Sequence, residues 1–133
     1  MKCIIQLYRQ NAVKAKETLE RLSTAFKLER SLNEYIANYS LGMKQKVYLI
    51  AAFLSGAGNL ILDEPFNGLD PESVATLKKF LIEYRDAGNL VLFSAHNLDL
   101  VANFCDYVVF IDKQRKVFQF ENPRDFVQLE DAF

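Results

Sequence analysis

The sequence predicts an α/β fold in which a helical part precedes a mainly parallel sheet. Three short apolar runs, at 60–62, 90–93 and 107–111, have the character of strands buried inside a sheet. Stretches with helical character separate these runs, so strands and helices alternate along the chain. Such alternation is typical of parallel sheets whose strands are joined by right-handed helical crossovers.

Length and composition place the chain among single globular domains. It has 133 residues, of which 50% are hydrophobic and 25% are charged, as expected of one domain with its own core. The formal net charge of -1 provides no broad cationic surface. Nucleic acid is therefore not expected as a partner.

No segment of the sequence resembles a membrane span or a signal peptide. No apolar run approaches the roughly 20 residues of a spanning helix, and Arg9 follows the apolar N-terminus too soon for a signal peptide. We expect a cytoplasmic protein that is peripheral to the inner face of a membrane when it docks on a membrane partner. Cys3 and Cys105 have no metal-binding or CxxC spacing, so buried, reduced thiols are expected.

Residues 1–55 are expected to form a helical subdomain. Between Tyr8 and Phe26 apolar residues recur in alternating steps of four and three, which places them on one face of a helix. These residues are Tyr8, Ala12, Ala15, Leu19, Leu22 and Phe26. A second helix is predicted from Ser40, a favourable N-cap residue, to about Leu54, with glycines after it.

The first part of the segment 56–133 alternates strand, helix and strand. The run at 60–62 is predicted to be a strand buried on both faces, and the run at 90–93 repeats this pattern. Pro71 begins a predicted helix that extends to about Arg85, and Gly88 then turns the chain. We expect this segment to form the α/β core.

The remainder of the segment adds a third strand and a hairpin. Asn97 can cap a short helix to about Phe104, which precedes the strand at 107–111. A polar turn at 112–116 leads into 117–120, which predicts an antiparallel edge hairpin, and Asn122 precedes a final short helix. The phenylalanines at 80, 104 and 126 are expected to pack in the core.

Two carboxylates, Asp63 and Glu64, directly follow the first buried strand. Ligands bind at the carboxyl ends of strands in α/β sheets, so both acids lie where a site is expected. Neighbouring side chains of an extended segment point in opposite directions. One acid can therefore face a hydrated Mg²⁺ while the other faces a water that must lose a proton. An acidic strand end without a ligand is the alternative, and these two residues alone do not decide between them.

Four motifs in a compatible order favour the site. The run SLGMKQK at 40–46 resembles the signature motif of ATP-binding cassette (ABC) ATPases, and LILD at 60–63 resembles their Walker B strand. NGLD at 67–70 resembles the D-loop, and SAH at 94–96 resembles the segment with the switch histidine. The resemblance extends from about Tyr8 to Asp112 and covers the C-terminal half of such a domain.

The resemblance implies a partial P-loop NTPase fold and the ATPase of an exporter-type membrane transporter. Glu64 would be the catalytic carboxylate, Asp63 would hold Mg²⁺ through water, and His96 would contact the γ-phosphate. The implied cofactors are ATP and Mg²⁺. The implied partners are a transmembrane permease subunit and a second nucleotide-binding domain in a dimer. A structural role is the alternative for His96, the chain's one histidine.

Three further residues would contact nucleotide or cross the dimer interface. The helix after Ser40 has no acid in its first turn, so its positive end suits a γ-phosphate, and Gly42 permits close approach of a phosphate. A helix cap with a chance glycine is the alternative. Asp70 would lie in the D-loop, and it also fits an ordinary N-cap before Pro71; both readings can hold together.

The sequence departs from the family chiefly in lacking a GxxxxGK[ST] loop, which binds the β- and γ-phosphates. In that family the strand before this loop lies between the strands that correspond to 90–93 and 107–111. The resemblance therefore implies a sheet without this interior strand, exposed edges, and no ATP hydrolysis by the chain alone. Met43 also replaces the usual glutamine and cannot donate its amide hydrogen bond, and Lys46 stands where arginine is usual.

Two other functions fit part of the pattern. A split or relic cassette would be a non-catalytic interaction module, and an absence of nucleotide binding would favour it. A cassette of a DNA-repair or ribosome-associated ATPase would be expected to have coiled-coil arms or tandem cassettes with a charged linker, and the sequence contains neither.

Overall fold

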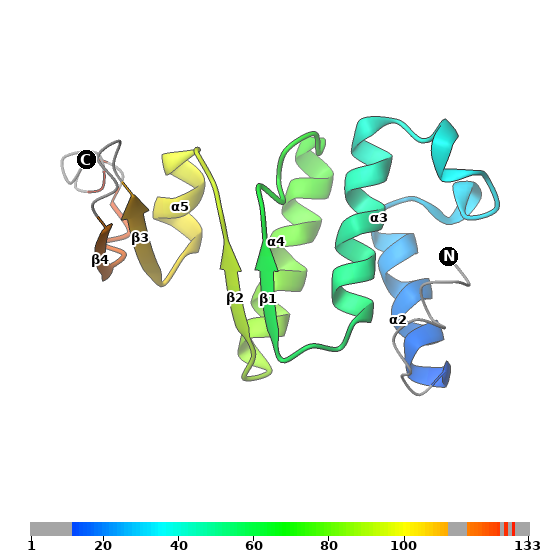
Figure 1. The fold of residues 1–133 in the computed structure, drawn as a ribbon, viewed down its shortest axis with the longest axis horizontal. Helices are drawn as coiled ribbons and strands as arrows, with labels where there is room; N and C mark the ends of the chain where they lie inside the picture. Colours follow the sequence, from blue (N-terminus) through cyan, green and yellow to red (C-terminus); the bar gives the residue numbers. More distant parts are fainter. Residues whose placement is uncertain (1–11, 112–116, 126, 128, 130–133) are drawn as a thin grey trace. The chain divides into compact units, whose positions relative to one another are not determined.

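The computed structural model describes residues 12–111, 117–125, 127 and 129, and the chain forms two compact units, Met1–Ser94 and Ala95–Phe133. The first unit contains α2 (Ala12–Ala25), η1 (Glu29–Ser31), η2 (Ile36–Asn38), α3 (Leu41–Leu54), β1 (Asn59–Leu62), α4 (Pro71–Asp86) and β2 (Leu90–Phe93). The second contains α5 (Leu98–Phe104), β3 (Tyr107–Ile111) and β4 (Val117–Glu121), as labelled in Figure 1. Cys3, Tyr8, Phe126, the predicted turn at 112–116 and much of the predicted final helix lie outside the described residues.

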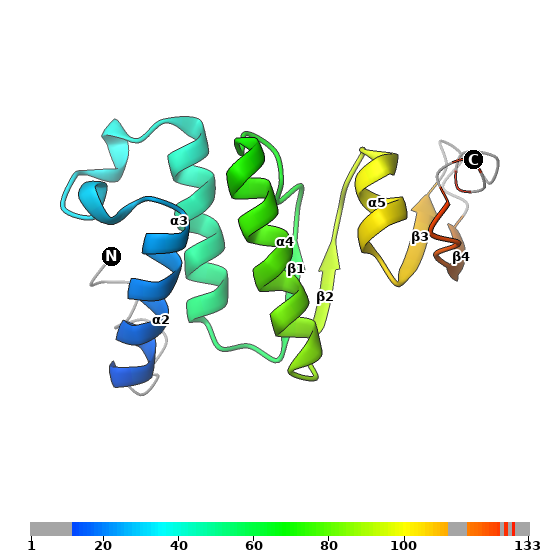
Figure 2. The same cartoon turned by 180° about the vertical axis from the view of Figure 1, so that it is seen from behind.

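Helices α2, α3 and α4 share the core of the first unit. The described part of the predicted apolar stripe is confirmed, because Ala15 and Leu22 on α2 and Phe26 directly after it are buried. The ring of Phe80 on α4 lies 6.2 Å from that of Phe26 and 5.9 Å from that of Phe53 on α3, centroid to centroid. The buried Phe80 therefore contacts both other helices, and Figure 2 shows the three helices side by side.

Three helices begin at a residue whose side chain accepts a hydrogen bond from the backbone of the first turn. The pairs are Ser40 with Met43 at 3.2 Å, Asp70 with Ser73 at 2.9 Å, and Asn97 with Leu100 at 3.0 Å. The predicted starts of α3, α4 and α5 are thereby confirmed. Gly56 and Gly88, with φ of 63° and 86°, supply the left-handed conformation in which the chain leaves α3 and α4.

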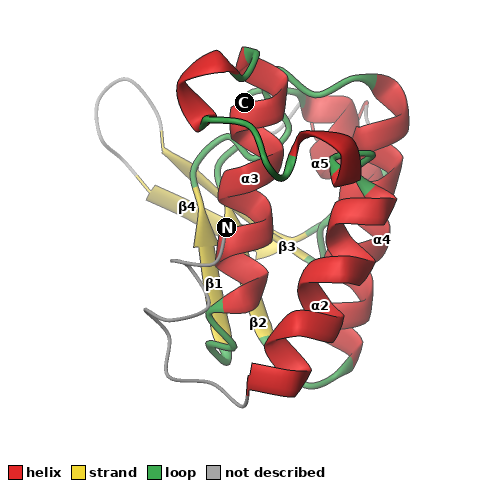
Figure 3. Cartoon of the chain, turned by 90° about the vertical axis from the view of Figure 1, so that its right-hand side faces the viewer, coloured by secondary structure: helices red, strands yellow, loops and turns green. Residues whose placement is uncertain are grey.

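Strands β1 and β2 are parallel neighbours, as predicted, and α4 connects them. Their register pairs Leu60 with Val91 and Leu62 with Phe93. The N–H of Ser94 donates to the carbonyl of Leu62 at 3.0 Å, which continues the ladder one residue beyond β2. The carboxyl ends of both strands therefore meet at one edge of the sheet. Figure 3 shows α4 to one side of these two strands.

The two faces of the β1–β2 sheet differ in burial. Leu60 is 4% exposed, whereas Ile61, which points to the opposite face, is 78% exposed and its register partner Leu92 is 51% exposed. The prediction that these strands are buried on both faces is therefore wrong. The reason is that α4 covers one face, as Figures 1 and 2 show from opposite sides, while Ile61 and Leu92 remain open to solvent.

The second unit is built from α5 and the β3–β4 hairpin. β3 and β4 are antiparallel, and Val108 pairs with Phe120, which confirms the predicted hairpin. Among the described residues of this unit, Ala102, Val108 and Leu129 form the core cluster, with half-buried neighbours around them, and Leu100 is buried as well. A core of this size provides only modest hydrophobic stabilisation.

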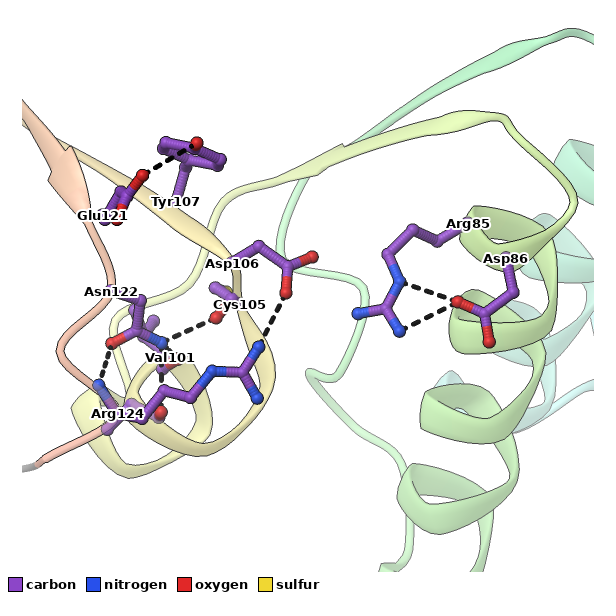
Figure 4. A network of polar contacts seen from close by, with 10 residues as sticks. Arg85, Asp86, Val101, Cys105, Asp106, Tyr107, Glu121, Asn122 and Arg124 are labelled. Carbon is purple, nitrogen blue, oxygen red and sulfur yellow. Dashed lines mark hydrogen bonds and ion pairs between the residues drawn. The ribbon is translucent and has the colours of Figure 1, made fainter.

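A buried asparagine supplements that small core. The side-chain amide of Asn122 donates to the carbonyls of Val101, Ala102 and Cys105, at 2.8, 3.0 and 2.7 Å. These carbonyls lie in the last turn of α5 and just after it, where a helix leaves most carbonyls without intrahelical partners, although that of Val101 also accepts from the N–H of Cys105 at 3.1 Å. Figure 4 shows this network together with the ion pair between Arg124 and Asp106, which are 2.8 Å apart. Asn122 therefore fastens the end of β4 to the end of α5.

Strands β2 and β3 belong to separate two-stranded sheets in the described part of the chain. The predicted absence of an interior strand between them stays a prediction. The α/β fold class is confirmed by the parallel β1–β2 pair with its helical crossover. The compact units divide after Ser94, which is a different kind of division from the predicted one. The predicted division into residues 1–55 and 56–133 stays a prediction.

Candidate functional site

The two predicted acids follow β1 in a tight turn. Asp63 is exposed and Glu64 is half-buried. The φ of Glu64 is 43°, in a region that residues other than glycine rarely adopt, and the following Pro65 ordinarily favours an extended backbone before it. The carbonyl of Glu64 accepts a hydrogen bond from the N–H of Asn67 at 3.1 Å. Such conformations cost about 1–3 kcal/mol and are concentrated at functional sites.

Ser94, at the end of the neighbouring strand, connects the two acids. Its hydroxyl donates to Oδ1 of Asp63 at 2.6 Å and accepts from the N–H of Glu64 at 2.8 Å. The register of the sheet produces this contact, because Leu62 pairs with Phe93 and the next residues of both strands are therefore adjacent. The structure thus brings Asp63 and Glu64 together at one sheet edge and adds a hydroxyl to which the sequence assigned no role.

The N-terminus of α3 packs against the loop at 65–70. A Cβ atom at Gly42 would lie 2.7 Å from the carbonyl oxygen of Gly68, which is closer than side chains tolerate. One helical turn further on, Nε2 of Gln45 donates to the carbonyl of Pro65 at 3.1 Å. Glycine at position 42 is therefore required by a contact within the chain. Its approach to a phosphate stays a prediction.

A second link joins α3 to the same loop. Nζ of Lys46 lies 3.0 Å from Oδ2 of Asp70, and the Lys46 side chain is only 14% exposed. Hydrogen bonds from Ser73 and then from Lys46 hold the pKa of Asp70 well below its usual range. Asp70 is thus an ionised N-cap with a cation partner on α3. Its role at a dimer interface stays a prediction.

Ser40 lies exposed at the start of α3. Its hydroxyl oxygen accepts from the N–H of Met43, and the first turn of the helix contains no acid. The partial positive charge of this helix end is therefore not offset by a carboxylate within the helix. The contact of Ser40 with a nucleotide stays a prediction.

A shallow pocket of about 220 Å³ opens beside Asp63. Its lining is Gln45, Tyr48, Leu49, Ile61, Leu62, Asp63 and Pro65. Asp63 is the one charged side chain in this lining. Pockets that enclose drug-sized ligands usually have roughly 300–1,000 Å³, so this pocket is too small to enclose a nucleotide.

The donor set of the site fits a hydrated Mg²⁺. Mg²⁺ in phosphate sites keeps several waters and takes one or two protein carboxylates, and Asp63 offers one at an exposed strand end. Within residues 12–111, 117–125, 127 and 129, no three His, Cys, Asp or Glu side chains come together as a metal-binding group. The described residues therefore form no all-protein cation cage. The fit to ATP is partial, because the sequence contains no GxxxxGK[ST] loop.

His96 and Cys105 belong to the second unit. His96 is exposed, three residues after the end of β2, and its contact with a γ-phosphate stays a prediction. Cys105 is a free, half-buried thiol, and burial together with the nearby Asp106 raises its pKa to about 11. It is therefore protonated at neutral pH and unsuited to act as a nucleophile or metal ligand.

Three residues of the site region received no role from sequence reasoning: Ser94, Gln45 and Lys46. A usable signal existed for Ser94, because it is a hydroxyl residue directly after a strand that was predicted to run beside the strand of Asp63. No comparable signal existed for Gln45 and Lys46, since their partners depend on how α3 packs.

None of the helices in the described part of the chain has both the length and the apolar character of a membrane span.

Comparisons with known proteins found a matching family model and similar individual proteins. A family model described as "AAA domain, putative AbiEii toxin, Type IV TA system" matches residues 5–102. "Putative ABC transporter ATP-binding protein AlbC" of Bacillus subtilis (strain 168) is 42% identical over 94 residues, or 71% of this chain and 39% of the relative. "ABC-type transporter ATP-binding protein EcsA" of the same organism is 38% identical over 101 residues, or 73% and 41%. The chain thus spans about 40% of the length of these relatives.

Solved structures are similar over most of the chain. "Structure of ATP binding subunit of ABC transporter" matches with a TM-score of 0.86 and 28% identity, over 98% of this chain and 59% of the other. An archaeal ribosome recycling factor, solved in complex with a ribosomal stalk protein, matches with a TM-score of 0.69 and 26% identity, over 89% and 23%.

Proposed function

Since the chain belongs to the AAA domain family and, with the relatives above, to the ATP-binding domains of ABC transporters, we propose that it couples ATP binding and hydrolysis to transport. The predicted partial P-loop NTPase fold is confirmed by its similarity to an ATP-binding subunit. Proteins of this class use ATP and Mg²⁺ and work with transmembrane permease components. The relatives named are transporter proteins, so we propose no toxin activity.

In the proposed reaction the two acids have separate tasks. Glu64 polarises the attacking water, and Asp63 holds the hydrated Mg²⁺. When bound, Mg²⁺ supplies positive charge that offsets the negative charge of the phosphates. His96 contacts the γ-phosphate from the segment after β2. The observation that carries this proposal is the pair of acids at the carboxyl end of β1, tied by Ser94 to the neighbouring parallel strand.

The remaining site residues are proposed to act between two domains. Ser40 and Gly42 would contact the nucleotide of an opposite subunit, and Asp70 would lie at the interface between the two domains. Hydrogen bonds of 3.1 and 3.0 Å and the close approach of Gly42 to Gly68 join α3 to the 65–70 loop, which supports a shared role for these residues. We propose that the second partner is a permease, that the protein lies at the inner face of the membrane, and that the transporter is of the exporter type.

We further propose that these 133 residues correspond to the C-terminal half of the domain and do not hydrolyse ATP alone. The support is that they contain no GxxxxGK[ST] loop and span about 40% of their relatives. We expect the purified chain to show no ATPase activity. Turnover by the chain alone, lost in Glu64→Gln, would contradict this part of the proposal.

The role of Glu64 is tested in the complete ATPase assembly that contains this chain. Glu64→Gln removes the base but keeps the shape of the side chain, so kcat is expected to fall by roughly 10²- to 10⁴-fold while nucleotide binding persists. Glu34→Gln, at an exposed position in the loop between η1 and η2, is the matched control and should turn over as the wild type does. Wild-type turnover by Glu64→Gln would remove Glu64 from this role.

The uncovered sheet face favours a second candidate, a non-catalytic interaction module. Ile61 and Leu92 expose a paired apolar surface, and apolar surface of this kind is commonly covered by another protein segment. Titration of the chain with ATP and Mg²⁺, followed by calorimetry, discriminates the two candidates. Measurable binding supports the nucleotide site; its complete absence, also in the assembled protein, supports the interaction module.

A further inference from the structure

We propose that Ser94 is a positioning residue that fixes both acids of the site at once, through its hydroxyl. The hydrogen-bonding part of this inference stands on geometry alone. Its consequence for turnover rests on the ATPase function proposed above. Two experiments separate these parts, one without nucleotide and one with it.

Ser94 is attached to the end of β1 by three hydrogen bonds. Its N–H donates to the carbonyl of Leu62 at 3.0 Å and continues the parallel ladder. Its hydroxyl donates to Oδ1 of Asp63 at 2.6 Å and accepts from the N–H of Glu64 at 2.8 Å. One residue directly after β2 thus contacts three consecutive residues at the site edge. The backbone bond sets the position of the Ser94 Cα, and only a short side chain then reaches both acids.

The chemistry of a hydroxyl suits this position. It has one hydrogen to donate and lone pairs to accept, and the structure uses the hydrogen for the carboxylate of Asp63 and a lone pair for the amide of Glu64. A hydrogen bond to an ionised carboxylate is stronger than one between neutral groups. Because this hydrogen bond fixes the position of Oδ1 of Asp63, it restricts rotation of the carboxylate. It therefore also fixes the direction in which Oδ2 points.

Glu64 needs such support because its backbone is unusual. Its φ of 43° lies in the left-handed region, and Pro65 follows it. Two hydrogen bonds flank this conformation: Ser94 accepts from the N–H of Glu64, and the carbonyl of Glu64 accepts from Asn67. A residue in this conformation persists only where its surroundings determine it. The direction of the Glu64 side chain therefore depends on the Ser94 hydroxyl.

The same turn contacts β2 at a second point, and we expect this contact to hold the turn in place when the hydroxyl is removed. The rings of Phe66 and Phe93 are 5.5 Å apart, centroid to centroid, in an edge-to-face arrangement. Removal of the Ser94 hydroxyl should therefore leave the fold intact and change only the orientation of the two acids. This expectation makes the inference testable by substitution.

The first experiment measures amide hydrogen exchange of Glu64 by NMR in this chain, without nucleotide. We compare the wild type with Ser94→Thr and Ser94→Val, which have the same shape and differ in the hydroxyl. In Ser94→Val the Glu64 amide should exchange roughly fivefold to tenfold faster, as expected from the loss of one hydrogen bond, and in Ser94→Thr it should remain protected. Thermal unfolding of each variant shows that the fold is retained. Equal exchange in all three proteins, or protection lost equally in Ser94→Thr and Ser94→Val, would overturn the inference.

The second experiment measures steady-state ATP turnover in the complete assembly. Misorientation of the acids should lower kcat roughly 10- to 100-fold in Ser94→Val with little change in the KM for ATP, and Ser94→Thr should restore most of it. Ser55→Ala, which removes a hydroxyl at the end of α3 that is bonded to the Ala52 carbonyl at 2.6 Å, is the control and should not change kcat. A wild-type assembly without turnover would contradict the proposed function and leave the exchange result standing. Turnover that is equal in the wild type and Ser94→Val would refute the role of Ser94.

Discussion

The two compact units of this chain reach stability by different means. In the first unit, fully buried apolar side chains from three helices pack together, among them Leu22 on α2, Ile50 on α3 and Leu77 on α4. Among the described residues of the second unit, few apolar side chains are buried, and the amide of Asn122 joins α5 to the end of β4 through three backbone carbonyls. One unit depends on packing, and the other depends on a polar side chain with specific geometry.

This difference coincides with a division of the proposed chemistry. Asp63, Glu64 and Ser94 lie in the well-packed unit, whereas His96 lies in the unit with the small core. A packed apolar core tolerates little movement, which suits two acids that must keep a fixed orientation. Substitutions that damage one unit and not the other therefore test whether the comparison is correct.

The largest effect is expected from the core of the first unit. Leu77→Ala removes a fully buried side chain and leaves a cavity, which should lower the free energy of unfolding by about 2–5 kcal/mol. Urea unfolding followed by circular dichroism measures it. Ile82→Ala on the same helix, at a position that is 37% exposed, is the control and should cost less than half as much. Equal losses in both variants would show that packing does not dominate in this unit.

A smaller effect, confined to the second unit, is expected for Asn122→Ala. Three carbonyls lose the side-chain amide as a donor, although that of Val101 keeps the N–H of Cys105, and the cost should be about 1–3 kcal/mol. Amide exchange should quicken in β3 and β4 while the amides of β1 and β2 keep their protection. The control is Asn103→Ala. The side-chain amide of Asn103 donates to the carbonyl of Asp99 on the surface of α5. Faster exchange in β1 and β2 as well would contradict the separate stability of the two units.

The smallest effect is expected from Asp70 and should depend on pH. Its pKa is lowered in the folded chain by the hydrogen bonds from Ser73 and Lys46. The folded chain therefore binds fewer protons than the unfolded chain, so this contribution is present above pH about 4 and is lost as the pH falls through the lower, folded pKa. Because the Asp70 side chain is half exposed, the contribution should be only a few tenths of a kcal/mol.

Asp70→Asn provides the measurement. The difference in unfolding free energy between the wild type and this variant should be greatest at pH 7 and should shrink toward pH 2. Lys46→Met should show a part of the same dependence. A difference that is constant over this range would show that the charge of Asp70 contributes nothing and that only its role as an N-cap matters.

Local signals in the sequence predicted much of this fold. Ser40, Asp70 and Asn97 were recognisable as N-caps because capping depends on residues within one helical turn. The apolar stripe of α2 and the hairpin of β3 and β4 were likewise visible as periodic patterns. The acids Asp63 and Glu64 could be placed at a sheet edge because parallel strands end on the same side.

Features that depend on contacts between distant segments could not be predicted. The resemblance implied a phosphate contact for Gly42, which stays a prediction, but no signal in the sequence indicated its backbone contact with Gly68, twenty-six residues further along. The apolar run of β1 suggested burial on both faces, although only one face of the sheet is covered and Ile61 is open to solvent. In both cases the residue type was informative, but the partner was set by tertiary packing.

The contacts between α3 and the 65–70 loop restrict how this part of the chain can evolve. Three residues of α3 each contact one residue of the loop. Gly42 lies against Gly68, Gln45 donates to the carbonyl of Pro65, and Lys46 forms an ion pair with Asp70. A larger residue at position 42 demands a shift of the loop, and the loop cannot shift without breaking the two other contacts. The helix tip and the loop must therefore change together or not at all, and substitutions accepted in one are expected to be accompanied by substitutions in the other.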